Sequence, residues 1–448
     1  MRILIRVVLV LIVLGVVAGA FMAWNLGRAA ALPSQPATSV AAASIITQPI
    51  ADGPNAEQLR RGQYLVRMGD CLSCHLRPGG EPFAGGLGLN TPFGVIYSSN
   101  ITSDPTNGIG NWTPEQFYKA MHDGIGGRGQ HLYPAFPYPW FRNLERADDD
   151  ALLAYLKTTK PVAYQPPGND LIFPMNIRFM VSFWNVLALR DTPKSQAPAN
   201  APPDWSRGAI LVRGPGHCSA CHTPRNLLGA DKKGHDLQGG LLDAFFAPDL
   251  TGNQRTGLGR WSVDDITQYL KTGRNKLASA GGPMGDVVTY STSLITDEDR
   301  HAIAVYLKSL PASPDAEIAA AEPVAMKRGA AIFSDACTAC HLENAVGQPT
   351  LFPPLGNNAV AQQNDPTGVL HIILAGMRVG PSPTRPSPLA MPSFAWKLTD
   401  QQVADVTTYV RNSWGNKASP VKAGEVAKLR KQLDLVNVRL TDNSGDQP

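Results

Sequence analysis

The chain has 448 residues, of which 43% are hydrophobic and 17% are charged, so it can bury a core and does not have the composition of a disordered protein. Its formal net charge of +4, without a basic block interleaved with aromatic residues, argues against a nucleic-acid-binding protein. The length gives a prior of about three domains. All six cysteines fall in pairs, which makes them the most informative residues of the chain.

An apolar run from Val7 to Trp24 follows Arg2 and Arg6 near the N-terminus. Its length lies between that of a signal-peptide core and that of a membrane-spanning helix, so a cleaved signal and a retained anchor both stay open for residues 1–28. The basic residues ahead of the run favour an N-terminus inside and a body outside. We therefore expect an exported protein on the periplasmic side of the cell inner membrane. Residues 29–54 resemble an Ala-, Pro- and Ser-rich linker.

The motif C-x-x-C-H occurs three times and uses every cysteine: Cys71, Cys74 and His75; Cys218, Cys221 and His222; Cys337, Cys340 and His341. This spacing places two thiols on one helical turn, where they add to the two vinyl groups of a haem, and the histidine follows as the proximal iron ligand. Zinc sites need paired C-x-x-C units, and three units do not divide into four-ligand sites. We therefore predict three covalently bound haem c groups.

The surroundings of the motif repeat as well. Each motif is preceded by an Arg-Gly pair in a short apolar helix and followed by an amphipathic helix with apolar residues at i, i+3 and i+4. These closing helices are predicted at Asp148–Lys157, Asp297–Lys308 and Asp400–Ser413. A helix at each end around a haem is the plan of cytochrome c. We thus predict an all-α fold of three tandem class I cytochrome c domains at 55–165, 205–312 and 322–416, with an apolar segment and linker at 166–204 and an amphipathic tail at 421–448.

Class I cytochromes c take a methionine as the sixth iron ligand, from the loop before the last helix. Met284 lies in such a loop as Gly-Pro-Met-Gly, and Met391 lies in another as Ala-Met-Pro-Ser-Phe. A lone methionine is often a core residue, but a methionine beside proline or glycine in this loop is better explained as a ligand. We predict Met284 and Met391 as metal ligands.

The first repeat departs from this pattern, because the equivalent position holds Phe136 in Tyr-Pro-Ala-Phe-Pro-Tyr. Phenylalanine cannot ligate iron, and three arrangements remain open. Met175 or Met180 reaches the iron from the downstream segment, His131 ligates it, or the iron is five-coordinate and covered by Phe136.

Three further features have more than one interpretation. Phe179–Leu189 is apolar and too short to span a membrane, so it is either buried core or an interfacial, quinone-contacting surface. In the tail, apolar residues at helical spacing are surrounded by lysine and arginine, which fits a membrane surface, a partner subunit or packing on the third repeat. Arg225 is either a partner of a haem propionate or an ordinary surface residue.

Beyond residue 50, the chain resembles the trihaem cytochrome c subunits of the membrane-bound dehydrogenases of acetic acid bacteria and their relatives. The matching stretches are Ser-Asn-Ile-Thr-Ser-Asp-Pro from Ser99, Gly-Ile-Gly-Asn-Trp-Thr from Gly108, His-Leu-Tyr-Pro-Ala-Phe-Pro-Tyr from His131, Phe-Pro-Met-Asn-Ile-Arg from Phe173, Cys-His-Thr-Pro-Arg-Asn from Cys221, and Trp-Ser at Trp261. Many members carry methionine where this chain has Phe136.

The resemblance implies electron flow from a separate catalytic subunit, through the three haems, to membrane ubiquinone. That partner carries pyrroloquinoline quinone, flavin or molybdopterin, and oxidises an alcohol, aldehyde, gluconate, sorbitol or fructose. The Pro-Ala-Phe-Pro variant fits the aldehyde-oxidising, molybdenum-type complexes.

Without the resemblance, the sequence still indicates an electron relay and not an enzyme, because no nucleophile triad, phosphate loop or carboxylate pair stands out. Two alternatives are a haem peroxidase with an open first haem and a cytochrome that donates to a terminal oxidase.

Overall fold

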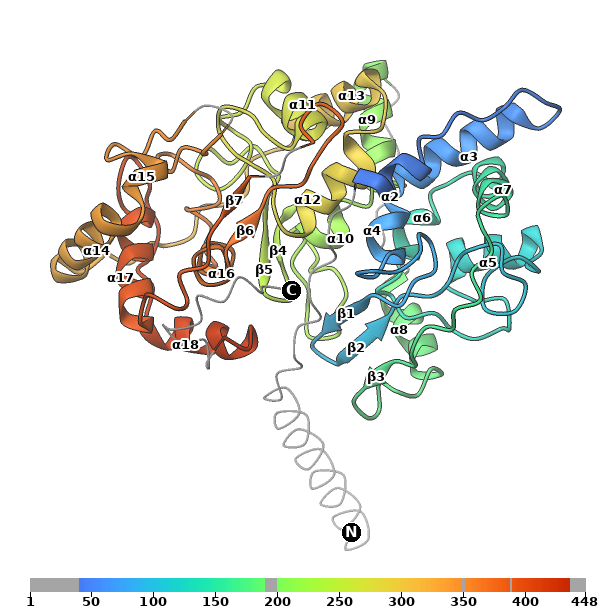
Figure 1. Cartoon of the computed structure of the whole chain (residues 1–448), viewed down its shortest axis with the longest axis horizontal. Coiled ribbons are helices and arrows are strands. Elements are labelled where there is room, and N and C mark those ends of the chain that lie inside the picture. The colour runs from blue at the N-terminus through green and yellow to red at the C-terminus, as the bar shows by residue number, and fades with distance from the viewer. Residues whose placement is uncertain (1–39, 190–199, 349–350, 387–388, 436–448) are drawn as a thin grey trace, which may run out of the picture.

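The computed structural model describes residues 40–189, 200–348, 351–386 and 389–435. The predicted signal or anchor at 1–28 lies outside these residues. Within them, no helix has both the length and the apolar character needed to cross a membrane. We refer to residues 55–165, 205–312 and 322–416 as repeats 1, 2 and 3. Repeat 2 lies between the other two (Figure 1).

Repeat 1 and the segments around it contain helices and one small sheet. The elements are α2 (Val40–Ile45), α3 (Ala56–Met68), α4 (Cys71–His75), β1 (Gly88–Thr91), β2 (Gly94–Tyr97), α5 (Pro114–Asp123), α6 (Tyr138–Phe141), α7 (Arg146–Leu156), β3 (Asp170–Leu171) and α8 (Met180–Ala188). The strands form an antiparallel sheet in the order β1-β2-β3. Part of the predicted linker at 166–204 therefore completes the sheet of repeat 1.

Repeats 2 and 3 each run from a long first helix through a short motif helix and a middle helix to a closing helix. Repeat 2 contains α9 (Pro203–Arg213), α10 (Ser219–His222), β4 (Gln238–Leu242), β5 (Phe245–Asp249), α11 (Val263–Thr272), α12 (Pro283–Val287), the π-helical turn η2 (Val288–Thr292) and α13 (Asp297–Lys308). Repeat 3 and its tail contain α14 (Pro323–Ala336), α15 (Thr338–His341), α16 (Thr367–Ala375), β6 (Met377–Arg378), β7 (Ala390–Met391), α17 (Asp400–Arg411) and α18 (Ala423–Gln432).

Each repeat is built on a crossed pair of helices, as the sequence predicts: α3 with α7, α9 with α13, and α14 with α17. The glycine of each Arg-Gly pair lies at the crossing, where a Cβ atom would overlap a backbone carbonyl of the closing helix: Gly62 at Ala151, Gly208 at Ala302 and Gly329 at Asp405. The arginine beside it pairs with a carboxylate of the same helix: Arg61 with Asp148, Arg207 with Asp299 and Arg328 with Asp405. The repeated dipeptide therefore sets the close approach of the two helices.

The all-α prediction is wrong in one respect, because short antiparallel strands occur in every repeat: β1-β2-β3, β4-β5 and β6-β7. These ribbons consist of two to five residues per strand, too few for the alternation of apolar and polar residues that marks a strand in sequence. Two of these ribbons bear on function. The β4-β5 ribbon contacts repeat 3 through Phe245 and His371, and the β6-β7 ribbon carries Met391.

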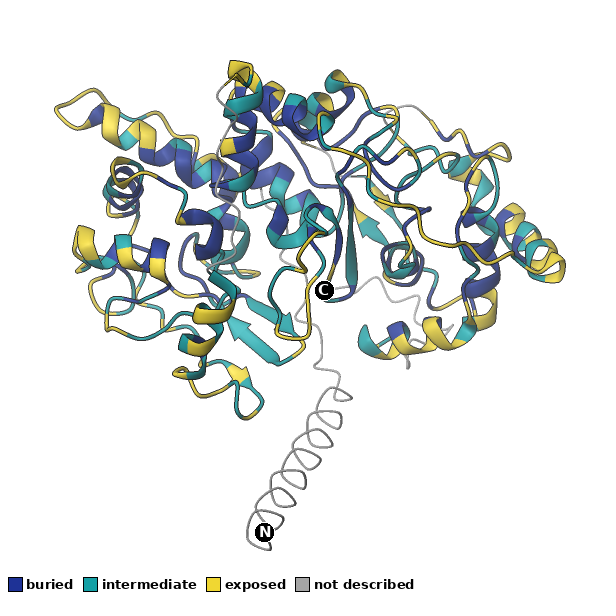
Figure 2. Ribbon diagram, turned by 180° about the vertical axis from the view of Figure 1, so that it is seen from behind, coloured by how far each residue is buried: buried dark blue, intermediate teal, exposed yellow. Residues whose placement is uncertain are grey.

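The structure decides between the interpretations of the segment Phe179–Leu189 and of the tail. Buried core is wrong for most of the former, since Phe179 just before α8 and Phe183 and Leu187 within it are exposed, and only Val181 is buried within that helix. By contrast, α18 packs on repeat 3 through buried Val426 and Leu429. Figure 2 shows its outer face exposed. Residues 436–448 of the tail lie outside the described residues.

Candidate haem-binding site

The three attachment motifs have the same local geometry. Each lies on a single short helical turn, α4, α10 or α15, that starts just after the first long helix of its repeat. All six cysteines are unpaired, so no C-x-x-C pair forms a disulfide. Burial raises the pKa of the Cys71 and Cys218 thiols to about 12 and that of Cys221 and Cys337 to about 11. These groups are therefore neutral thiols at physiological pH.

The three predicted proximal histidines are oriented by one shared hydrogen bond. The Nδ1–H of each donates to a backbone carbonyl downstream: His75 to Ser99 O at 2.6 Å, His222 to Pro248 O at 2.7 Å and His341 to Pro353 O at 3.2 Å. In repeats 1 and 2 a β ribbon delivers this carbonyl. Burial lowers the pKa of all three imidazoles. A neutral ring with Nδ1 occupied leaves Nε2 free to bind a metal.

One continuous cavity of about 1970 Å³ connects the three motifs. Its walls include all six cysteines, the three histidines, and both Met284 and Met391. Most of the other lining side chains are apolar or aromatic, as a porphyrin requires. Paired free thiols, a neutral histidine with an open Nε2 and an apolar hollow beside them therefore fit a covalently attached haem in each repeat.

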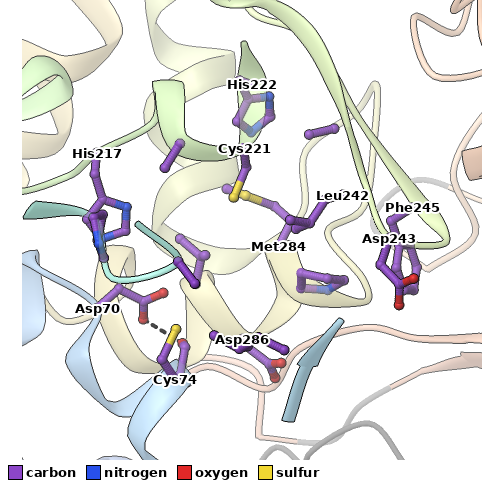
Figure 3. Close-up of a pocket in the computed structure, with 18 of the residues that line it drawn as sticks. Asp70, Cys74, His217, Cys221, His222, Leu242, Asp243, Phe245, Met284 and Asp286 are labelled. Carbon is purple, nitrogen blue, oxygen red and sulfur yellow. Dashed lines mark hydrogen bonds between the residues drawn. The ribbon is translucent and has the colours of Figure 1, made fainter. Parts of the chain in front are cut away.

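The predicted sixth ligands both precede the closing helix of their repeat, but they lie in a short helix and a short strand and not in loops. Met284 belongs to α12, and Figure 3 shows its thioether directed towards Cys221, beneath His222. Met391 ends β7, where it pairs with Met377 across the ribbon. Both methionines are partly buried against the core of their own repeat and line the cavity. When haem is bound, a thioether ligand raises the reduction potential and closes the iron to outside ligands.

Repeat 1 has Phe136 in the cavity wall, with its ring 5.6 Å from that of Phe141. Met175 and Met180 line the same cavity, whereas His131 does not. The peptide of His131 is also held in place, because its carbonyl accepts a hydrogen bond of 3.0 Å from Arg178. Of the sequence-based possibilities, a ligand from Met175 or Met180 and a five-coordinate iron covered by Phe136 remain compatible with the cavity.

Arg225 lines the cavity but is already engaged. It pairs with Asp231, donates to Ala220 O at 2.5 Å and lies 5.4 Å from the ring of Trp140 in repeat 1. Burial raises the pKa of Asp231 to about 6. Arg225 therefore joins repeats 1 and 2, a role that neither sequence-based interpretation included.

Several residues around the cavity escape sequence reasoning. His217 directly precedes Cys218, and its Nε2–H donates to Gly69 O of repeat 1 at 3.2 Å. His371 of repeat 3 stacks on Phe245 of repeat 2, with ring centroids 3.7 Å apart. Met377 is the cross-strand neighbour of Met391. A histidine next to a motif was a visible signal, but the partner of His371 lies far away in the sequence, and the two-residue strands that pair Met377 with Met391 are too short to show a pattern.

Comparison with known proteins identifies the kind of chain that carries this site. The Cytochrome c family profile matches residues 207–311 and 326–414. The chain is 41% identical over 404 residues to the cytochrome c subunit of alcohol dehydrogenase (quinone) from Gluconacetobacter polyoxogenes, covering 85% of this chain and 86% of the relative.

Two further relatives are subunits of other dehydrogenases. The chain is 40% identical to the gluconate 2-dehydrogenase cytochrome c subunit of Pantoea cypripedii, covering 85% of this chain and 91% of the relative. It is 34% identical to the fructose dehydrogenase cytochrome subunit of Gluconobacter japonicus, covering 88% and 87%. The resemblance noted from the motifs is thus confirmed, and it implies covalently bound haem c. The chain belongs to the family of cytochrome c subunits of dehydrogenase complexes, which transfer electrons for a catalytic subunit and are not themselves the enzyme.

Proposed function

We propose that the chain is a three-haem electron relay that carries electrons from the catalytic subunit of an alcohol- or aldehyde-oxidising dehydrogenase to membrane ubiquinone. The observation that carries this proposal is the single cavity whose walls contain all three attachment motifs. Haems attached at these motifs would lie in one cavity, so electrons could pass between them without crossing solvent. Each repeat is then a cytochrome c domain, with His75, His222 and His341 as proximal ligands and Met284 and Met391 as sixth ligands.

The exposed face of α8 supports a position at the membrane surface, on the periplasmic side of the inner membrane. Phe179, Phe183 and Leu187 are 64%, 54% and 63% exposed, and the neighbouring loop adds Leu227, which is 96% exposed. Trp184 ties the helix to this loop through a hydrogen bond of 2.9 Å to Leu228 O. Contiguous exposed apolar surface of this kind marks a membrane or partner contact. The apolar run Val7–Trp24 supplies the corresponding tether in sequence.

Purification of the native complex in detergent tests the proposal. Anaerobic addition of an alcohol or aldehyde is expected to reduce the c-type haems, and a ubiquinone analogue is expected to reoxidise them. Pyridine haemochrome assay of the denatured chain should give three haems. A count below three, or haems that the quinone does not reoxidise, would contradict the relay.

For haem 1 we propose a sixth ligand from Met175 or Met180, because both line the cavity. Carbon monoxide binding to the reduced protein distinguishes the possibilities. The wild type should bind none, and one of the variants Met175→Leu and Met180→Leu should bind about one molecule per chain. Binding by the wild type itself would instead indicate an open iron covered by Phe136, the feature on which a peroxidase activity would depend.

A further inference from the structure

We infer that repeat 3 holds Met284, the proposed sixth ligand of haem 2, in place. The segment Met377–Gly380 and His371 of repeat 3 support residues 280–285, which we call the Met284 loop. Ligation of the second iron therefore depends on docking of the third repeat. This inference rests on the proposed function in that it takes Met284 as an iron ligand. Three separate contacts, all made to glycines that flank Met284, carry it.

The first contact joins backbone to backbone. Gly281 forms an antiparallel β-bridge with Val379, and the Gly380 N–H donates to Ala280 O at 3.3 Å. Beyond Met284, Gly285 lies directly against Gly380, so closely that a Cβ atom on Gly380 would overlap the Gly285 carbonyl. Both ends of the loop that presents Met284 are therefore in contact with one short segment of repeat 3.

The second contact is the thioether of Met377, which lies on Gly281 in the space that a side chain there would fill. Met377 pairs with Met391 in the β6-β7 ribbon, and Arg378 pairs with Ala390. The strand that presses on the Met284 loop is thus hydrogen-bonded to the strand that carries the predicted ligand of haem 3. The two ligand loops are joined through this ribbon.

The third contact runs through the β4-β5 hairpin. The ring of Phe245 covers Gly282, where a Cβ atom would lie 2.6 Å from its Cε1. On the hairpin, Phe245 is stacked on His371 of α16 at 3.7 Å with an interplanar angle of 28°. The Nδ1–H of His371 donates to Ala244 O at 3.0 Å, which fixes the ring on the hairpin. Figure 3 shows Phe245 beside the Met284 loop.

The same hairpin is anchored at its tip. Asp243 accepts hydrogen bonds of 3.2 Å from Asn90 of repeat 1 and from Gln432 of α18. The hairpin that carries this ring is therefore supported from repeat 1 and from the tail. Because an iron–thioether bond forms only when the sulfur is held within reach of the metal, a loop so rich in glycine needs such outside support.

The inference is tested with two variants outside the loop, Gly380→Ala and Met377→Ala, in the complete complex. The first adds a methyl group against the Gly285 backbone, and the second removes the thioether from Gly281. Each is expected to retain three haems and to lose the near-infrared absorption of one oxidised Met-ligated haem. In each, one of the reduction potentials should fall, and the reduced protein should bind about one more molecule of carbon monoxide per chain.

Gly424→Ala is the control for an added methyl group, because Gly424 lies in α18 and its added Cβ atom meets nothing within 4 Å. It should leave spectrum and potentials as in the wild type. Unchanged spectra and potentials in both test variants, with three haems present, would overturn the inference. Absence of the methionine band for haem 2 in the wild type would instead refute Met284 as a ligand and thus the proposed function at that site.

Discussion

The two junctions between the repeats join different parts of the predicted haem sites. At the junction of repeats 1 and 2, the loops just before the attachment motifs meet: His217 donates to Gly69 O, and the methyl group of Met68 touches Gly216. At the junction of repeats 2 and 3, the predicted sixth-ligand loops meet, with Gly285 against Gly380.

The two junctions should have different effects, because the bonds between protein and haem that they support differ in strength. A thioether link between cysteine and haem is covalent and persists whatever its neighbours do. A methionine–iron bond is coordinate and is lost when the loop moves away. We therefore expect the first junction to govern the stability of the fold and the spacing of haems 1 and 2, and the second to govern ligation of haem 2. Four predictions test or sharpen this contrast.

The largest effect is expected at Asp299, which belongs to both the helix crossing and the first junction. It accepts two hydrogen bonds of 2.7 Å from Arg207 and one from the Tyr64 hydroxyl of repeat 1. Asp299→Ala leaves these partly buried donors unpaired and should lower the free energy of unfolding by about 3 kcal/mol. Urea unfolding measures this loss. Asp148→Ala removes the corresponding, more exposed pair with Arg61 and should cost about 1 kcal/mol or less; equal losses would contradict a role of Asp299 at the junction.

Arg255 is the corresponding residue of the second junction. It donates to Gln362 O at 2.7 Å and to Asn364 at 3.2 Å, and it pairs with Asp315. Arg255→Ala should cost about 2 kcal/mol, because these carbonyls and carboxylates lose a charged donor. Thermal unfolding followed by circular dichroism measures the change. Arg260→Ala, which removes a single hydrogen bond to Asn357, is the control and should cost clearly less.

The second junction should also weaken in acid. Burial lowers the pKa of His371 to about 4, so the folded protein holds this ring neutral while an unfolded chain protonates it near pH 6.5. The unfolded state therefore binds more protons below pH 6.5, and stability falls as pH falls, by about 2 kcal/mol between pH 6.5 and 5. In His371→Gln this part of the pH slope should disappear from urea unfolding curves. The exposed His301→Gln should keep it; a slope unchanged by both variants would exclude His371 as its source.

The smallest effect is expected for Tyr64→Phe, which removes only the hydroxyl that reaches Asp299 across the first junction. Since Arg207 still satisfies the carboxylate, the loss should be about 1 kcal/mol. A double-mutant cycle with Asp299→Ala isolates this contact, because the tyrosine change should then have almost no further effect. Additive losses would mean that the two residues stabilise the fold independently.

The sequence predicted the parts of each repeat well, for reasons that are local. The closing helices were expected at Asp148–Lys157 and Asp297–Lys308, and the structure has Arg146–Leu156 and Asp297–Lys308. Their apolar residues recur at helical spacing, and this pattern needs no knowledge of the partner helix. The same reasoning applies to the cysteines and histidines, whose motif spans a single turn.

The exposure of α8 could not be predicted from the sequence, because an apolar stretch of that length has the same composition in a core and on a binding surface. Only the surrounding chain decides which it is, and here Val181 faces inward while Phe179 and Phe183 do not. The tail raised the same ambiguity with the opposite result, since Val426 and Leu429 are buried on repeat 3.

The haem-attachment motifs of this protein could be predicted from its sequence alone, because two thiols and the adjacent histidine lie within five neighbouring residues. The arrangement of the three sites was decided only by the tertiary structure. Contacts such as Gly285 with Gly380, Phe245 with His371, and His217 with Gly69 join residues that are far apart in the chain. Such pairs depend on complementary shape between separately folded repeats, and no periodic pattern in the sequence records that complementarity.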